Sequence, residues 1–190
     1  MCDSPNYAAS SRQLVDSSTR IRKMVLAPLL AALTGAASLI AIPVGPVPVT
    51  LQSLFVLASG GILGARWGAV SMTLYLAMGI AGLPVFAGGT SGLGRLIGPT
   101  GGYLLGFVVA AAVVGAMAAR SARQLRLFLA TLAGLAVVYA MGSVWLSVVA
   151  KFPMSKALMV GVLPFVPMDL LKAFLAALLI GRWRKKFEVP

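Results

Sequence analysis

Between Ser17 and Phe187 the chain holds a single acidic residue, Asp169, inside a hydrophobic stretch long enough to cross a membrane. Lys172 follows three residues later in the same stretch. An Asp or Lys near the centre of a membrane helix costs about 2.5 to 3.5 kcal/mol, so such side chains normally face a protein interior or a polar cavity. At this spacing the two side chains share one helix face. They predict either an ion pair that holds helices together or a polar site with an acceptor and a donor for a ligand.

The rest of the chain is too apolar for a soluble fold. Of its 190 residues, 59% are hydrophobic and 11% are charged, and the mean hydropathy is +0.96. Because a membrane helix needs about 20 residues, we expect an all-α integral membrane protein with six transmembrane helices. We place these helices near residues 22–42, 50–63, 68–83, 102–119, 125–149 and 157–180.

The basic residues alternate between the expected connections in the pattern of the positive-inside rule. Twelve of the 16 lie before or at the start of the first expected helix, in the turn around Arg66, in the segment 120–126 and after residue 181. This pattern predicts that both termini are cytoplasmic. Arg95, Lys151 and Lys156 then lie on the outer side.

Residues 1–20 are polar and rich in Ser, and we expect them to form a disordered cytoplasmic tail. Residues 21–190 would form a single six-helix membrane domain. Cys2 is the only cysteine, there is no His, and no P-loop pattern occurs. These absences argue against a disulfide within the chain, a metal site and ATP hydrolysis. The sequence therefore predicts a protein that is not an enzyme and has no cofactor.

A glycine-rich segment on the outer side is a second candidate for ligand contacts. Seven glycines lie between Pro84 and Tyr103. Such density permits positive φ values and exposes backbone groups to a ligand. Arg95 is the only charge in this segment, and it could anchor to lipid phosphates or form a bidentate contact with a ligand carboxylate.

Two further patterns concern the first and last expected helices. Pro164 and Pro167 precede Asp169, so a helix that restarts at Pro167 would place this carboxylate in its first turn. In the first helix, small residues recur on one side, which allows close packing within the chain or against a separate membrane subunit. They are Ala27, Ala31, Ala32, Gly35 and Ala36.

Four segments resemble the BioY family, the biotin-specific substrate-binding S components of energy-coupling factor (ECF) transporters. They are PVPVTLQ at 46–52, GLPVFAGG at 82–89, GPTGGYLLGF at 98–107 and PFVPMDLLKA at 164–173. The resemblance implies a six-helix protein that captures biotin from outside, with the long glycine-rich extracellular loop between helices 3 and 4 closing over the pocket.

The resemblance also implies roles for single residues. Asp169 and Lys172 match the positions that bind the ureido head group, and Arg95 is assigned to the carboxylate. Relatives can use an Asn near the end of the third helix, but this sequence has no Asn after Asn6, so Gln52, Ser91 or a loop backbone group must substitute. Further candidates for the pocket wall are Thr50, Tyr75, Phe86 and Tyr103.

Uptake in this family implies partners: a coupling membrane protein and two ATPase subunits that use ATP. The docking face is then expected at Ala27 and Ala31, with Ala32 and Ala36 as the alternative register. The implied location is the cytoplasmic (inner) membrane. The alternative function is a solitary biotin transporter that works without a dedicated ATPase module.

Overall fold

The chain folds almost entirely into helices. The structure is a computed structural model that describes the backbone of residues 5–42, 47–120 and 123–187, and side chains from residue 17 to 186 within these ranges. Its elements in chain order are α1 (Pro5–Ala37), β1 (Ala41–Ile42), β2 (Val49–Thr50), α2 (Gln52–Leu63), α3 (Ala65–Ile80), α4 (Leu93–Ile97), α5 (Gly101–Ala118), α6 (Gln124–Val149), α7 (Met154–Gly161) and α8 (Val166–Phe187).

Helices α5 and α6 are long and apolar enough to cross a membrane, and α7 with α8 makes a third candidate if the bent pair counts as one span. The two helices of that pair meet at 59°. By the same test on the described residues α2, with 12 residues, is shorter than a full span. The all-α class is confirmed, whereas the arrangement of six membrane crossings remains a prediction.

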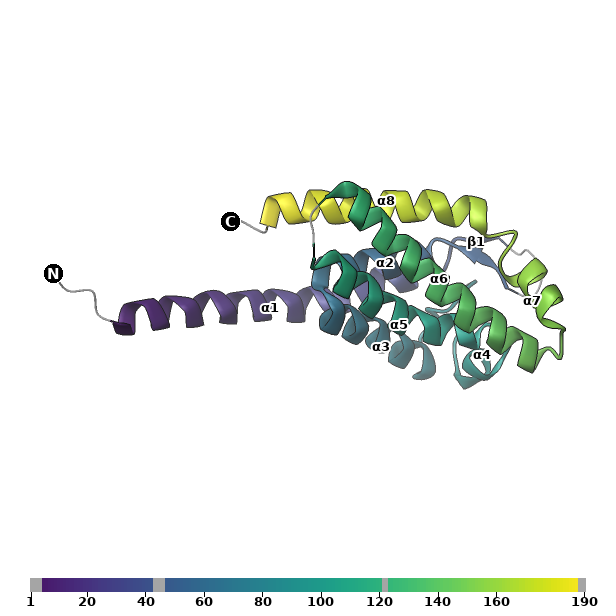
Figure 1. Cartoon of the computed structure of the whole chain (residues 1–190). Coiled ribbons are helices and arrows are strands. Elements are labelled where there is room, and N and C mark those ends of the chain that lie inside the picture. The colour runs from purple at the N-terminus through teal and green to yellow at the C-terminus, as the bar shows by residue number, and fades with distance from the viewer. Residues whose placement is uncertain (1–4, 43–46, 121–122, 188–190) are drawn as a thin grey trace.

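The first and last helices differ from their expected bounds. Helix α1 begins at Pro5, so it includes most of the segment that we expected to be a disordered tail. In Figure 1 it extends well beyond the other helices. The last expected helix is divided, because α7 ends at Gly161 and α8 begins at Val166. Proline restricts the backbone before Pro164 and Pro167, which explains a break at this point.

Helix α5 lies at the centre of the bundle and packs against α2, α3 and α6, while α8 packs against α2 and α6 and α1 against α2 and α3. Glycine permits the closest of these approaches. A Cβ atom on Gly60 of α2 would lie 3.0 Å from the Cα of Ala111 in α5 and even closer to its carbonyl group. The start of α1 and the end of α8 lie at one end of the bundle, and α4, β1 and α7 lie at the opposite end (Figure 1).

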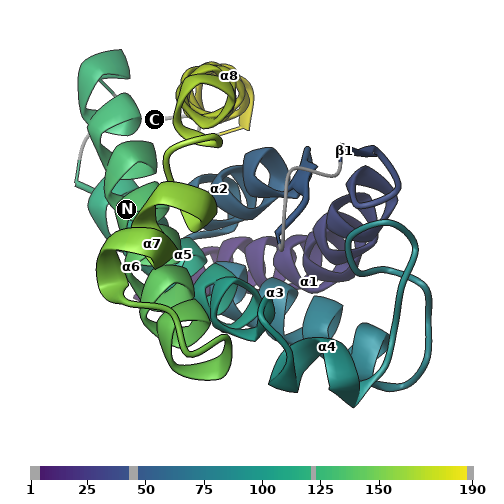
Figure 2. The ribbon, with the colours of Figure 1, turned by 90° about the vertical axis from the view of Figure 1, so that its right-hand side faces the viewer.

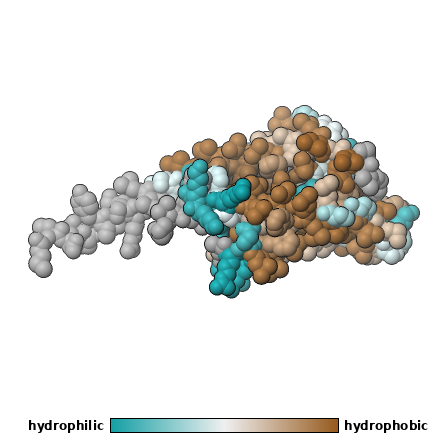
Figure 3. All heavy atoms as spheres, turned by 90° about the horizontal axis from the view of Figure 1, so that it is seen from above, coloured by the Kyte–Doolittle hydropathy of each residue, from teal (hydrophilic) through white to brown (hydrophobic). Residues whose placement is uncertain are grey.

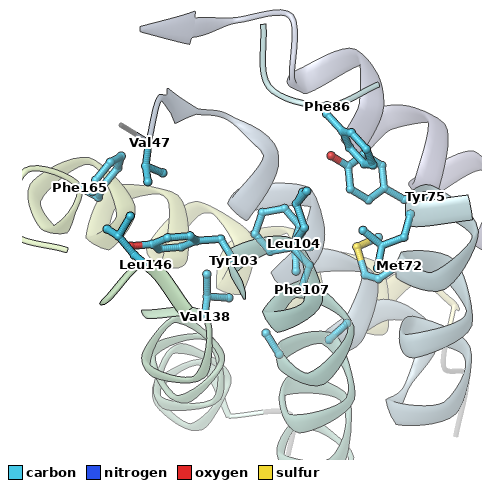
Figure 4. Packing of buried hydrophobic residues seen from close by; sticks show 14 of the residues in the cluster. Val47, Met72, Tyr75, Phe86, Tyr103, Leu104, Phe107, Val138, Leu146 and Phe165 are labelled. Atoms are coloured by element: carbon cyan, nitrogen blue, oxygen red, sulfur yellow. The ribbon is translucent and has the colours of Figure 1, made fainter. Parts of the chain in front are cut away.

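Buried aromatic side chains fill the bundle toward the end where α4 and α7 lie. Tyr75 and Phe86 pack edge to face, with ring centroids 5.7 Å apart, and Tyr103 lies beside Leu146 (Figure 4). On the face seen in Figure 3, hydrophobic residues cover the bundle, and hydrophilic side chains gather mainly where α1 leaves it. This surface is typical of a protein surrounded by lipid, with charged groups at the membrane boundary.

Residues 81–100, which we call the glycine-rich loop, connect α3 to α5 and contain α4. Figure 2 shows α4 and this loop beside α3, across the end of the bundle from α7. Phe86 is buried over Gly79, where no side chain would fit, and its backbone pairs with Thr90. The predicted positive φ values occur, for example 92° at Gly92, whose amide donates to the carbonyl of Gly79 at 2.8 Å. The loop is thus folded onto the end of α3.

Candidate ligand-binding site

A cavity of about 650 Å³, including the part that opens to solvent, lies among β2, α2, α5, α6, α8 and the glycine-rich loop. Most of its wall is apolar, and a few polar groups converge in it. The lining residues are Val47, Pro48, Thr50, Gln52, Ser53, Phe86, Ala87, Thr90, Arg95, Thr100, Tyr103, Leu104, Phe107, Val138, Tyr139, Phe165, Asp169 and Lys172.

Asp169 lies in the first turn of α8, as the prolines predicted, and only 6% of its surface is exposed. Its Oδ1 accepts hydrogen bonds from Lys172 Nζ at 2.8 Å and Ser53 Oγ at 3.0 Å. Its Oδ2 accepts from the hydroxyl of Tyr139 at 2.7 Å. The start of a helix also favours a negative charge. Three hydrogen bonds and the dipole of the helix therefore stabilise this carboxylate in the cavity wall.

Lys172 is 3% exposed and forms an ion pair with Asp169. Its ammonium group also donates to the backbone carbonyl of Thr50, at the end of β2. An ammonium has three N–H donors, so one remains after these two bonds. A carboxylate has about four acceptor positions, of which three are used here. The pair can thus offer one donor and one acceptor to a ligand.

Gln52 is buried and held from two sides. Its Oε1 accepts from the hydroxyl of Thr50 at 2.9 Å, and its Nε2 donates to the hydroxyl of Tyr75. Since a primary amide has two N–H donors, the second is available beside the Asp169 and Lys172 pair that shares the cavity. Fixing both ends of the side chain keeps this donor in one orientation.

The structure brings most of the sequence-predicted residues to one cavity: Asp169, Lys172, Arg95, Gln52, Phe86, Tyr103 and Thr50 all line it. Two do not. Tyr75 is completely buried behind Gln52, so it supports the wall without lining it. Ser91 is exposed and borders a shallow depression on the outside of the glycine-rich loop together with Arg95.

Sequence reasoning missed the two polar residues that contact the carboxylate, Ser53 and Tyr139, and two threonines of the wall, Thr90 and Thr100. Ser53 and Tyr139 lie 116 and 30 residues from Asp169 in the chain, and each donates to its carboxylate. Single hydroxyl groups in apolar helices are common and carry no local pattern. Ser53 could have been noticed, because it follows Gln52 directly at the start of a helix.

The expected docking residues divide into two groups. Ala27 and Ala31 are buried, with exposed fractions of 1% and 0%, and the carbonyl of Ala27 accepts from Ser71 Oγ of α3 at 2.7 Å. This register therefore packs within the chain, contrary to our preferred expectation, because α2 and α3 cover that face of α1. The alternative residues, Ala32 and Ala36, are exposed.

Comparisons with known proteins agree with this architecture. The model of the BioY family matches residues 10–189. The biotin transporter BioY of Thermotoga maritima is 40% identical over 169 residues, covering 89% of this chain and 99% of that protein. The probable biotin transporter BioY of Pyrococcus horikoshii is 37% identical and covers 86% of this chain and 96% of its own. These relatives are named as transporters, which supports the prediction that the chain is not an enzyme.

A solved structure is also similar: the crystal structure of the S-component for biotin from an ECF-type ABC transporter. It superposes with a TM-score of 0.83 at 29% sequence identity, covering 88% of this chain and 93% of the other.

Proposed function

The chain belongs to the BioY family, and from this membership we propose that it captures biotin and serves in its uptake as the S component of an ECF-type transporter. The observation that carries the proposal is the Asp169 and Lys172 pair, buried in the wall of an otherwise largely apolar cavity. Keeping two charges in such a place is costly, and a polar ligand that needs both a donor and an acceptor explains why they are there.

Biotin fits the chemistry of this cavity. It has a ureido ring with two N–H donors and one carbonyl acceptor, an apolar thiophane ring, and a chain that ends in a carboxylate. The remaining acceptor of Asp169 would receive one ureido N–H, and the remaining donor of Lys172 would bind the ureido oxygen. The apolar wall, with Phe86, Phe107 and Phe165, would surround the thiophane ring.

The second ureido N–H needs another acceptor. The hydroxyl oxygens of Ser53 and Tyr139 donate their protons to Asp169 but keep lone pairs, and both line the cavity. Gln52 is the side chain we propose in place of the Asn that relatives use, because it is buried, oriented and part of the wall; its free N–H would donate to the ureido oxygen beside Lys172. Ser91 is a poorer choice because it is exposed outside the cavity.

At the other end of the ligand, we assign the valerate carboxylate to Arg95. This residue is exposed on α4 yet borders the cavity, and it is the only charged residue of the glycine-rich loop. A guanidinium group suits a planar carboxylate because it can donate two parallel hydrogen bonds. The ligand would then be held from a buried head-group site to the outer loop.

The membrane arrangement that goes with this function has six spans, with both termini on the cytoplasmic side of the inner membrane. The positive-inside distribution supports it. The start of α1 and the end of α8 lie at the same end of the bundle, which is consistent with it (Figure 1). In this orientation the Asp169 end of the cavity and the glycine-rich loop lie toward the outside.

Energised uptake by this chain would need partners, because its sequence contains no P-loop. We propose a coupling membrane protein and two ATPase subunits, with no cofactor on the chain itself. The exposed residues Ala32 and Ala36 are the proposed docking register, since their small side chains leave a face of α1 open to close helix packing.

Calorimetric titration of the purified chain tests the binding proposal. Biotin should bind tightly and thiamine and riboflavin should not, and Asp169→Ala should abolish biotin binding while the protein remains folded, because ureido N–H groups would lose their acceptor in a dry pocket. Wild-type affinity in this variant would refute the head-group site. Biotin uptake by the chain alone in liposomes would favour the solitary transporter over the ECF assembly.

A further inference from the structure

Trp145, on α6, is linked to the loop that carries Arg95 although the two residues are 50 positions apart. Its indole N–H donates a hydrogen bond of 3.0 Å to the carbonyl of Gly98, which directly follows α4. This carbonyl lies at the C-terminal end of the short helix on which Arg95 is placed. The bond therefore joins α6 to the residue that follows α4, the short helix that carries Arg95.

Few other contacts fix this turn. Within the described residues, the other hydrogen bonds of segment 93–100 run inside the segment or to its immediate flanks. One of them, from the hydroxyl of Thr100 to the carbonyl of Arg95 at 3.2 Å, closes the turn on itself. Leu96 packs against the buried core, but the other residues of this five-residue helix are exposed and add little packing. Trp145 thus supplies the side-chain hydrogen bond from another helix.

The sequence around α5 is adapted to this position of the indole ring. Gly101 and Gly102 begin α5 against Trp145: a Cβ on Gly101 would lie 3.0 Å from the indole nitrogen, and one on Gly102 would lie 2.8 Å from Cγ. A side chain at Gly102 would collide with Trp145, and one at Gly101 would come into tight contact with its ring. The glycine pair therefore allows the ring to sit against the loop-to-helix junction and to reach Gly98.

We infer that Trp145 is a positioning residue for the acidic end of the ligand: by anchoring Gly98 it holds α4 so that Arg95 borders the cavity. The inference rests on the proposed function, in which Arg95 binds the carboxylate. It predicts a specific defect. Loss of the indole N–H should weaken ligands that carry the carboxylate and spare a ligand in which that group is neutral.

The test compares biotin with biotin amide, whose tail is uncharged, on the purified full chain in nanodiscs by calorimetric titration. Trp145→Phe keeps an aromatic ring and removes the N–H. Since one hydrogen bond is worth about twofold to tenfold in affinity, we expect the Kd for biotin to rise by up to about tenfold and the Kd for the amide by less than about twofold. Arg95→Ala should change the two ligands in the same unequal way.

Trp67→Phe is the matched control, because Trp67 packs against the separate cluster of Ala27, Leu30 and Leu63, away from the cavity. It should change neither affinity. Equal weakening of both ligands by Trp145→Phe would overturn the inference, because it would mean a general packing role. Unchanged binding of both would overturn it as well.

The controls separate this inference from the proposed function. If Arg95→Ala lowers the preference for biotin and Trp145→Phe does not, the inference fails and the carboxylate assignment stands. If Arg95→Ala changes neither ligand, the assignment of Arg95 fails and the inference fails with it. A folded wild-type chain that does not bind biotin would refute the proposed function itself. If Trp145→Phe does not yield folded protein, Trp145→Leu, which also lacks a donor, replaces it under the same criteria.

Discussion

Replacing Lys172 with Met would leave the Asp169 carboxylate buried without its counterion. Removing one partner of a buried ion pair typically costs about 3 to 5 kcal/mol of folding free energy. Asp169 would keep its hydrogen bonds from Ser53 and Tyr139, which partly compensate the charge, while the carbonyl of Thr50 would lose a donor. We therefore expect Lys172→Met to destabilise the protein by about 3 kcal/mol, at the lower end of that range.

A second substitution tests this reasoning by whether it raises or lowers the stability of the Lys172→Met variant. Adding Asp169→Asn to Lys172→Met removes the unpaired charge and keeps groups that can bond with both hydroxyls. The double variant should therefore be more stable than Lys172→Met alone, by about 2 kcal/mol, because replacing both charges of a buried pair is often nearly neutral. If the two substitutions destabilised the protein independently, the double variant would be less stable than Lys172→Met.

The assay is thermal unfolding of the detergent-solubilised chain without biotin. For a chain of this size, about 1 kcal/mol corresponds to roughly 2 to 4 °C in Tm, so Lys172→Met should melt about 6 to 12 °C lower. Lys156→Met, at an exposed lysine, is the control and should shift Tm by no more than about 2 °C. A double variant that melts below Lys172→Met would refute the argument that the unpaired carboxylate causes the loss.

Three further predictions concern the site, the packing and the docking face. Tyr139→Phe should weaken biotin binding about tenfold in a calorimetric titration, since the carboxylate of Asp169 loses an orienting donor. Gly60→Val should prevent recovery of folded protein in size-exclusion chromatography because its side chain would enter the backbone of α5, whereas Gly94→Ala, with open space around it, should behave as wild type. Ala32→Trp should retain biotin binding and lose energised uptake in cells; loss of both would place this residue in an internal contact.

Much of the candidate site could be predicted because membrane burial makes certain residues costly. Asp169 and Lys172 stand out in an apolar stretch, and the prolines before them predict a helix that restarts beside the carboxylate. Glycine density likewise predicted a loop with positive φ values, and Gly92 has one. In each case the physical constraint is local, so the pattern can be recognised without knowing which helices meet.

The contacts between distant helices could not be predicted in this way. Ser53 and Tyr139 are unremarkable polar residues in their own helices and become part of the site only because α2, α6 and α8 meet around the carboxylate. The same holds for Trp145, whose partner is a backbone carbonyl in another segment. Every residue has a backbone carbonyl, so the sequence does not show which one will accept the hydrogen bond.

The two faces of α1 show most clearly which features depend on the sequence alone and which depend on the tertiary structure. The sequence by itself determined that small residues recur along this helix, that the chain belongs in a membrane, and that one pair of charged residues interrupts an apolar stretch. Only the tertiary structure decided that Ala27 and Ala31 are covered while Ala32 and Ala36 are exposed. Small side chains permit close packing on either face, and which face is used depends on where α2 and α3 come to lie.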